Sequence, residues 1–376
     1  MRRSGRTSNL FDHRGMFLAG LLILVVTFAV VVISSSAFAQ DKIQIKFRNP
    51  FSPTGSWAMF WSCQDRFWPQ EGVYGEVEDG KGSADVVMAV GSGSSQMGYC
   101  QMAAIMVAVQ KGMPIQTILI GTQNDTSALF TLKERGFKNL KDFEGKTVGV
   151  FPFGYTGPLV KGMLKKNGVD LTRVKFTNVS VGNELPLLAT GKLDAFCGMV
   201  SAQDVQLLAM GHDVTVFPIK EYGMPIPSDG IIINTNWAKQ VGRETVLKYV
   251  RGIARGFILA KTDVNAIIED MIKYRPDQRL VYDVRMAENY PRWHYKYKSD
   301  IIEKHGFGWI DKNVMQFTQE TLLDVDILKE KIDVEKYYTM EYITDDTFRP
   351  LAMEYAKAKL DPNLKTYYDK IRGTKK

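Results

Sequence analysis

The sequence predicts an α/β protein with two lobes, and three observations support this fold class. The chain has 376 residues, which is more than one hydrophobic core usually holds. Short apolar strands alternate with amphipathic helices over short connections, a rhythm that predicts parallel-rich sheets with right-handed crossovers. A second α/β unit occupies about 126–227, and the apolar strand at 230–234 is placed to return to the first unit.

The N-terminal segment predicts export. Residues 1–39 comprise a basic stretch, an apolar run at 16–33 and a small-residue stretch that ends in the A-x-A pattern at Ala39. This is the pattern of a secretory signal peptide cleaved after Ala39, which predicts a periplasmic protein. The apolar run is long for a signal, so an uncleaved membrane anchor is the alternative.

The predicted strands and helices follow hydrophobic periodicity and the usual capping residues. Ser56 and Ser83 are expected to cap helices, while glycines such as Gly191 and Gly211 are expected to end them. The predicted strands are 43–47, 75–78, 96–99, 115–120, 127–132, 147–151, 174–179, 193–198, 214–218 and 230–234. The predicted helices are 56–68, 83–90, 103–110, 158–166, 184–190, 203–210, 246–261, 264–274, 277–288 and 312–323, followed by a polar helical tail expected to attach loosely.

Composition excludes several classes of function. The net charge is +7, and removal of residues 1–39 leaves +4 spread along the chain without a dense Lys/Arg block, which argues against nucleic-acid binding. Cys63, Cys100 and Cys197 are far apart, as are the four histidines, so neither a metal site nor a Cys/His nucleophile is expected. The cysteines are expected to be buried free thiols, and no cofactor is predicted.

Two phrases carry a family resemblance. Residues 136–150 read GFKNLKDFEGKTVGV and residues 187–195 read LLATGKLDA. They resemble the phrases G-I-K-x-x-x-D-L-K-G-K-x-V-G-V and A-L-x-x-G-K-x-D-A of solute-binding proteins of ABC importers for nitrate, sulfonates, taurine and thiamine-precursor pyrimidines. Phe137 and Phe143 depart mildly from the first phrase. The resemblance covers about 43–262, and 332–338 more weakly.

The resemblance implies a two-lobe, periplasmic-binding-protein-like fold of type II, with two hinge crossings near 121–127 and 225–230. The expected organisation is a signal peptide at 1–39, lobe 1 at 40–125 plus 228–346, lobe 2 at 126–227, and a C-terminal tail at 347–376. It also implies a small organic solute and an ABC permease in the inner membrane as partners, with the receptor acting as a monomer.

Candidate ligand-binding residues follow the carboxyl ends of the predicted strands, where ligands bind in open α/β sheets, and the resemblance implies loops at the same four positions. The turn at 153–157, between a strand and a helix start, is the strongest candidate because unpaired backbone N–H groups point outward there. Trp57 shares a helical stripe with Trp61 and Trp68, a pattern more typical of a core. The candidates are Asn49, Phe51, Ser52, Trp57, Tyr99, Cys100, Gln101, Phe153, Gly154, Tyr155, Thr156, Met199, Asp204 and Asp229.

The expected function is that of an exported receptor, not an enzyme. No Arg or Lys falls in the four loops, and their aromatic residues favour a flat heteroaromatic or aromatic compound, although a sulfonate stays open. One alternative is an enzyme similar to fungal thiamine-pyrimidine synthases, but their C-C-C-F-C phrase is absent here. The other alternative is a ligand sensor for a membrane signalling protein.

Overall fold

The computed structural model describes residues 44–373 except 52–54, 56 and 298. The predicted signal peptide and the candidate Ser52 therefore lie outside the described residues. Within the described part of the chain, no helix has the length and apolar character needed to cross a membrane.

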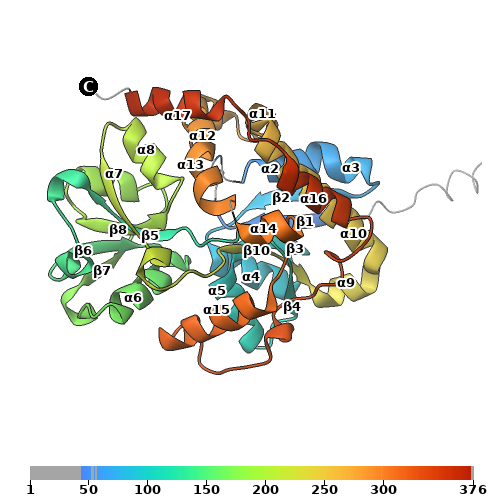
Figure 1. Cartoon of the computed structure of the whole chain (residues 1–376), viewed down its shortest axis with the longest axis horizontal. Helices are drawn as coiled ribbons and strands as arrows, with labels where there is room; N and C mark the ends of the chain where they lie inside the picture. Colours follow the sequence, from blue (N-terminus) through green and yellow to red (C-terminus); the bar gives the residue numbers. More distant parts are fainter. Residues whose placement is uncertain (1–43, 52–54, 56, 298, 374–376) are drawn as a thin grey trace, which may run out of the picture. The chain divides into compact units, whose positions relative to one another are not determined.

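In the described part of the chain, ten strands form two five-stranded sheets (Figure 1). The strands of the first sheet are β1 (Gln44–Asn49), β2 (Tyr74–Asp79), β3 (Met97–Gln101), β4 (Ile115–Ile120) and β10 (Asp229–Asn234). The strands of the second sheet are β5 (Ser127–Leu132), β6 (Thr147–Val150), β7 (Lys175–Asn178), β8 (Ala195–Met199) and β9 (Val214–Pro218). We call the half of the fold built on the first sheet lobe 1 and the half built on the second sheet lobe 2.

The two sheets share one topology. Their strand orders are β2-β1-β3-β10-β4 and β7-β6-β8-β5-β9. β1 pairs in parallel with β2 and β3, and β6 pairs in parallel with β7 and β8. One antiparallel strand completes each sheet, namely β10 between β3 and β4, and β5 between β8 and β9. The predicted α/β fold with parallel-rich sheets is confirmed.

Helices cover the sheets, and strands such as β3, β5, β8 and β10 are buried at every residue, which explains their continuous apolar character. The helices of the two units are α2 (Met59–Ser62), α3 (Trp68–Gln70), α4 (Ser83–Ser92), α5 (Met102–Gln110), α6 (Thr156–Lys166), α7 (Glu184–Ala189) and α8 (Gln203–Ala209). The helices that follow β10 are α9 (Thr235–Val241), α10 (Arg243–Thr262), α11 (Val264–Tyr274), α12 (Tyr282–Ala287), α13 (Asn289–Arg292), α14 (Asp300–His305), α15 (Lys312–Asp324), α16 (Arg349–Lys357) and α17 (Leu364–Gly373).

Shorter helical turns complete the fold. The π-helical turns are η1 (Cys63–Phe67), which joins α2 to α3, and η7 (Trp293–Tyr297). The 3-10 turns are η2 (Lys133–Arg135), η3 (Leu140–Phe143), η4 (Leu171–Arg173), η5 (Ile219–Tyr222), η6 (Pro276–Val281) and η8 (Val334–Lys336). The helix predicted at 277–288 is thus a 3-10 turn followed by α12.

The chain crosses between the lobes twice, between β4 and β5 and between β9 and β10. The two crossings run side by side, because Asp125 N–H donates to the Ile226 carbonyl at 2.8 Å and Ser228 N–H donates to the Thr122 carbonyl at 3.0 Å. Both lie where the resemblance implied hinge crossings. The residue boundaries proposed for the lobes stay a prediction.

Three further local predictions differ from the structure. Gly82 rather than Ser83 precedes the first turn of α4, and the Ser83 hydroxyl instead accepts a hydrogen bond from Gln101 N–H at 3.2 Å. β3 extends through Cys100 and Gln101, which were expected in a loop. The tail is not loosely attached: Ile371 of α17 is buried with Val205 and Ala287, and α17 lies along α12 and reaches α8 of lobe 2 (Figure 1).

Candidate functional site

A cavity of about 190 Å³ lies between residues of lobe 1, lobe 2 and the helices that follow β10. Four of the predicted ligand-binding residues line it: Phe51, Trp57, Thr156 and Met199. The other lining residues are Phe151, Val181, Gly182, Glu184, Ala202, Gln203, Gln206, Gln278 and Arg285.

Three aromatic rings from both lobes form one wall of the cavity. The Phe51 ring centroid lies 6.3 Å from that of Trp57 and 5.9 Å from that of Phe151, with interplanar angles of 31° and 55°. Trp57 is buried, as are Trp61 and Trp68, but of the three only Trp57 lines the cavity. The indole Nε1 of Trp57 is buried and has no hydrogen-bond partner among the described residues.

Glu184 places a carboxyl group in the cavity at the start of α7. It is only 3% exposed, and its Oε2 accepts a hydrogen bond from Gly182 N–H at 2.6 Å. Burial raises the pKa of this carboxyl, against the opposing effect of N–H donors that include Gly182 and the side chain of Gln203. Within the described ranges, Glu184 forms no ion pair with Lys or Arg.

A hydrogen-bonded polar network also contributes to the cavity lining. Arg285 donates to Gln278 Oε1 through Nε at 2.8 Å and to Glu288 Oε1 through Nη1 at 2.6 Å. Gln206 Nε2, on α8 of lobe 2, donates to the same Glu288 oxygen at 2.7 Å. The guanidinium charge of Arg285 is therefore already balanced by a carboxylate.

The turn before α6 contributes to the cavity through few of its residues. α6 begins at Thr156, which is buried and lines the cavity, whereas the Phe153 side chain is 55% exposed. The Phe153 carbonyl instead accepts a hydrogen bond from Ala84 N–H of lobe 1 at 3.2 Å. Gly154 is buried, and Tyr155 lines a separate hollow beside α6 with residues such as Lys165 and Ile327.

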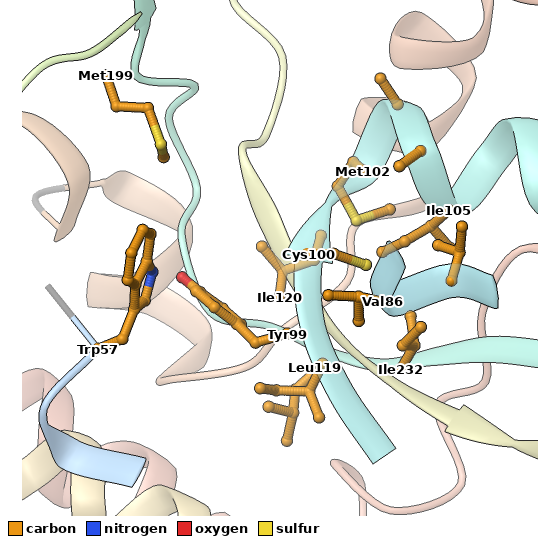
Figure 2. Close-up of a cluster of buried hydrophobic side chains, with 14 of the residues drawn as sticks. Trp57, Val86, Tyr99, Cys100, Met102, Ile105, Leu119, Ile120, Met199 and Ile232 are labelled. Atoms are coloured by element: carbon orange, nitrogen blue, oxygen red, sulfur yellow. The ribbon is translucent and has the colours of Figure 1, made fainter. Parts of the chain in front are cut away.

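The candidates on and near β3 are not among the residues that line the cavity. Tyr99 and Cys100 point to opposite sides of the strand, with Tyr99 directed toward Trp57 and Cys100 directed into the core (Figure 2). The Tyr99 hydroxyl lies 2.7 Å from Thr122 Oγ1 and donates to Asp229 Oδ2 at 3.4 Å, so Tyr99 and Asp229 share one cluster beside the crossings. Gln101 Nε2 donates to Ser127 Oγ of lobe 2 at 3.0 Å.

Asn49 and Asp204 lie apart from the cavity lining. Asn49 is fully buried, and neither polar atom of its side chain has a partner among the described residues. Asp204 lies in the first turn of α8, and burial raises the pKa of its carboxyl to about 6. The structure therefore brings together Phe51, Trp57, Thr156 and Met199, and leaves the other described candidates around them.

Sequence reasoning missed Glu184, Gln278 and Arg285. The rule that selected four loops also applies to the carboxyl end of β7, and the segment after it contains Glu184, so this residue could have been found. No local signal marks Gln278 or Arg285, because they come from a helical region more than 100 residues after β6. The three cysteines are buried free thiols, which confirms that prediction.

The chain is similar in sequence to two binding proteins and to one enzyme. It is 21% identical to the riboflavin-binding protein RibY of Chloroflexus aurantiacus over 255 residues, which cover 65% of this chain and 69% of RibY. It is 21% identical to the formylaminopyrimidine-binding protein of Halalkalibacterium halodurans over 53% of this chain and 60% of that protein. It is also 26% identical to the 4-amino-5-hydroxymethyl-2-methylpyrimidine phosphate synthase of Schizosaccharomyces pombe, over 38% of this chain and 40% of the synthase.

Solved structures show the same fold. The nitrate-binding protein NrtA of Synechocystis is similar with a TM-score of 0.64 and 10% identity, over 88% of this chain and 99% of NrtA. The alkanesulfonate-binding protein SsuA of Xanthomonas axonopodis, bound to MOPS, is similar with a TM-score of 0.61 and 12% identity, over 80% of this chain and 99% of SsuA. The chain thus has the fold of ABC-importer solute-binding proteins. A model of the NMT1/THI5-like family matches residues 60–264, more than half of the chain, and the chain therefore belongs to that family.

Proposed function

We propose that this protein is an exported receptor that binds a flat, uncharged or weakly basic heteroaromatic solute between its lobes and delivers it to an ABC importer. The observation that carries the proposal is the buried carboxyl of Glu184 in a cavity that is also lined by three aromatic rings and whose guanidinium is already paired. Export and the permease partner rest on the N-terminal sequence and on the family.

The aromatic wall supports a planar solute. Phe51 and Trp57 of lobe 1 and Phe151 of lobe 2 present ring faces and edges, and offset contacts with a bound ring stabilise a flat ligand. Cavities that hold drug-sized ligands have volumes of about 300–1,000 Å³. The smaller cavity here, about 190 Å³, suits one or two rings.

The polar groups support a ligand edge with both a donor and an acceptor. Trp57 Nε1 is a buried donor without a partner among the described residues, so a ligand carbonyl or ring nitrogen would satisfy it. Glu184 is a buried acceptor for ligand N–H groups. A sulfonate or nitrate ion would meet the Glu184 charge without a free guanidinium to offset it, and repulsion between like charges is strong in a buried site.

The relatives support the same chemical class. The names of two relatives state that they bind riboflavin and formylaminopyrimidine, both of which are flat heterocycles. The pyrimidine phosphate synthase among the relatives keeps an enzyme as the second candidate. An iron-dependent turnover assay with pyridoxal phosphate tests that candidate, and product formation would favour it over a receptor.

A thermal-shift panel tests the proposed receptor. The probes are formylaminopyrimidine, cytosine, riboflavin, MOPS and nitrate, each at saturating concentration. A bound heterocycle is expected to raise the melting temperature by several degrees, since saturation at 100-fold above Kd stabilises by about 2.7 kcal/mol. MOPS and nitrate are expected to give no shift. A shift with MOPS or nitrate alone would overturn the proposed ligand class.

A further inference from the structure

Glu288 is not among the residues that line the cavity, yet it is fully buried, and its carboxylate accepts hydrogen bonds from three residues. Its Oε2 accepts a hydrogen bond from Gly55 N–H at 2.7 Å. Its Oε1 accepts from Arg285 Nη1 at 2.6 Å and from Gln206 Nε2 at 2.7 Å. Hydrogen bonds to a charged acceptor in a buried site are stronger than those between neutral groups, so these three bonds stabilise the fold more than three neutral hydrogen bonds would.

The contact with Gly55 holds the backbone of this residue, which follows β1 in the chain. The Gly55 carbonyl also accepts a hydrogen bond from Arg292 Nη1 at 2.9 Å, so both backbone groups of this residue are held by the helical segment of α12 and α13. A Cβ at Gly55 would lie 2.3 Å from the Arg285 carbonyl oxygen, so only glycine permits this approach. Phe51 and Trp57, which flank Gly55 in the chain, both line the cavity.

The contact with Gln206 joins the lobes. Gln206 lies on α8 of lobe 2, whereas Gly55 follows β1 of lobe 1. When the lobes separate, Glu288 keeps its charge partner Arg285 and its bond to Gly55 and loses only the Gln206 amide, which water can then bind. Opening therefore does not leave the buried carboxylate of Glu288 without a charge partner, and closing adds one charge-assisted hydrogen bond.

We infer that Glu288 is a positioning residue that couples lobe closure to the arrangement of the binding cavity. Its three bonds hold Gln206 of lobe 2, Arg285 of α12 and Gly55 in one geometry. Gln206 and Arg285 both line the cavity. Lobe closure and the position of Gly55 thus stabilise each other. This inference rests on the proposed function, which is capture of a solute between the lobes.

Lobe closure in the ligand-free protein tests the inference without any ligand. Spin labels at Lys111→Cys in lobe 1 and Lys192→Cys in lobe 2, both exposed positions, report the distance between the lobes. The variant Glu288→Gln removes the charge, and Gln206→Met removes the hydrogen bond to Glu288 and keeps the charge. Both are expected to shift the distance distribution toward the open form relative to the unsubstituted labelled protein.

The matched controls are Glu341→Gln and Gln240→Met, at partly or fully exposed positions in the helical region after β10, which should leave the distribution unchanged. If the pair acts as one contact, the double variant Glu288→Gln with Gln206→Met will open the lobes no more than Glu288→Gln alone. Additive opening, or an unchanged distribution in Gln206→Met, would overturn the inference. Gln206→Met keeps the test decisive if Glu288→Gln does not fold.

Binding kinetics give the second readout. With the tightest-binding heterocycle of the panel, Gln206→Met is expected to weaken affinity about tenfold, mainly through faster dissociation, because the lost bond forms only after closure. A panel without any binder, combined with normal closure and the expected variant effects, would reject the proposed solute class and leave the role of Glu288 supported. Slower association with unchanged dissociation would contradict the coupling.

Discussion

The backbone N–H of Ala84 in lobe 1 donates a hydrogen bond to the carbonyl oxygen of Phe153 in lobe 2, at 3.2 Å. Ala84 lies in the first turn of α4, where N–H groups have no partner within the helix. The residue before α4, Gly82, has φ +136°, and a Cβ there would lie 2.2 Å from the Phe153 oxygen. The lobes therefore meet at a point where only glycine fits.

Gly82→Ala is expected to weaken ligand binding about tenfold, because the added methyl group pushes Phe153 away and disfavours closure. Titration calorimetry with the tightest-binding probe of the panel measures the effect. Gly112→Ala is the matched control, since Gly112 also has positive φ, +77°, but nothing lies within 4 Å of its Cβ position. The control should lose about 1 kcal/mol of stability and keep its affinity. Equal affinity in both variants would contradict the prediction.

Asp204→Asn is expected to stabilise the protein at neutral and alkaline pH. Burial raises the pKa of Asp204 from its ordinary value of 3.8 to about 6, so the native protein retains a proton that the unfolded chain loses. Stability therefore falls as pH rises from 3.8 to about 6, and above that range the buried charge costs about 3 kcal/mol. Asparagine removes the charge and keeps an oxygen for the N–H groups at the start of α8.

Urea unfolding at pH values below 3.8 and above 6 measures this difference, which should vanish in acid. Asp170→Asn is a control of opposite sign. Hydrogen bonds from the Thr172 hydroxyl and N–H lower the pKa of Asp170, so its replacement should reduce stability above the ordinary pKa rather than raise it. A stability gain for Asp204→Asn that is equal at all pH values would argue against a buried charge.

Glu184→Gln is expected to weaken binding of a heterocycle about tenfold or more, since a neutral amide is a weaker acceptor for ligand N–H groups. The ligand-free variant should be at least as stable as the wild type at neutral pH, because burial raises the pKa of Glu184 and the ionised carboxylate is disfavoured there. Glu134→Gln, at an exposed position of lobe 2, serves as the control. Calorimetry and melting curves separate the two effects, and stronger binding of MOPS to Glu184→Gln would further support charge exclusion.

The cysteines are expected to resist thiol reagents in the native state. Burial raises the pKa of Cys197 to about 12 and raises the pKa values of Cys63 and Cys100 as well, and all three thiols are buried. A colorimetric thiol assay should detect no fast-reacting group in the folded protein and all three thiols in denaturant. A fast-reacting native thiol would show that one of the surrounding cores opens readily.

Ile371→Ala is expected to destabilise the protein by about 2 kcal/mol, because Ile371 of α17 packs with Val205 and Ala287. Leu280→Ala is the control, since Leu280 is 90% exposed and should change stability by less than about 0.5 kcal/mol. Denaturant unfolding measures both changes. Equal stability of Ile371→Ala and the wild type would mean that α17 contributes little packing energy.

The sheets could be predicted because their strands are short apolar runs bounded by turn residues. Strands such as β4 and β9 begin and end as predicted, since each strand carries its own pattern. Phe51 and Trp57 were found because ligand loops follow strand ends. Arg285 could not be found, because its helix has an ordinary amphipathic pattern and only tertiary packing brings it to the cavity. Cys100 was placed in a loop because β3 continues past its apolar run into Gln101.

The position of β10 determines the order in which the lobes can be completed. β5 to β9 come from one continuous stretch, whereas lobe 1 lacks a strand until β10 pairs with both β3 and β4. The pairing of Ile232 with Gly98 joins residues on either side of the whole of lobe 2. Contacts between such distant residues form slowly, so insertion of β10 is expected to be the late step of folding. Lobe 2 can assemble while lobe 1 still has a gap in its sheet.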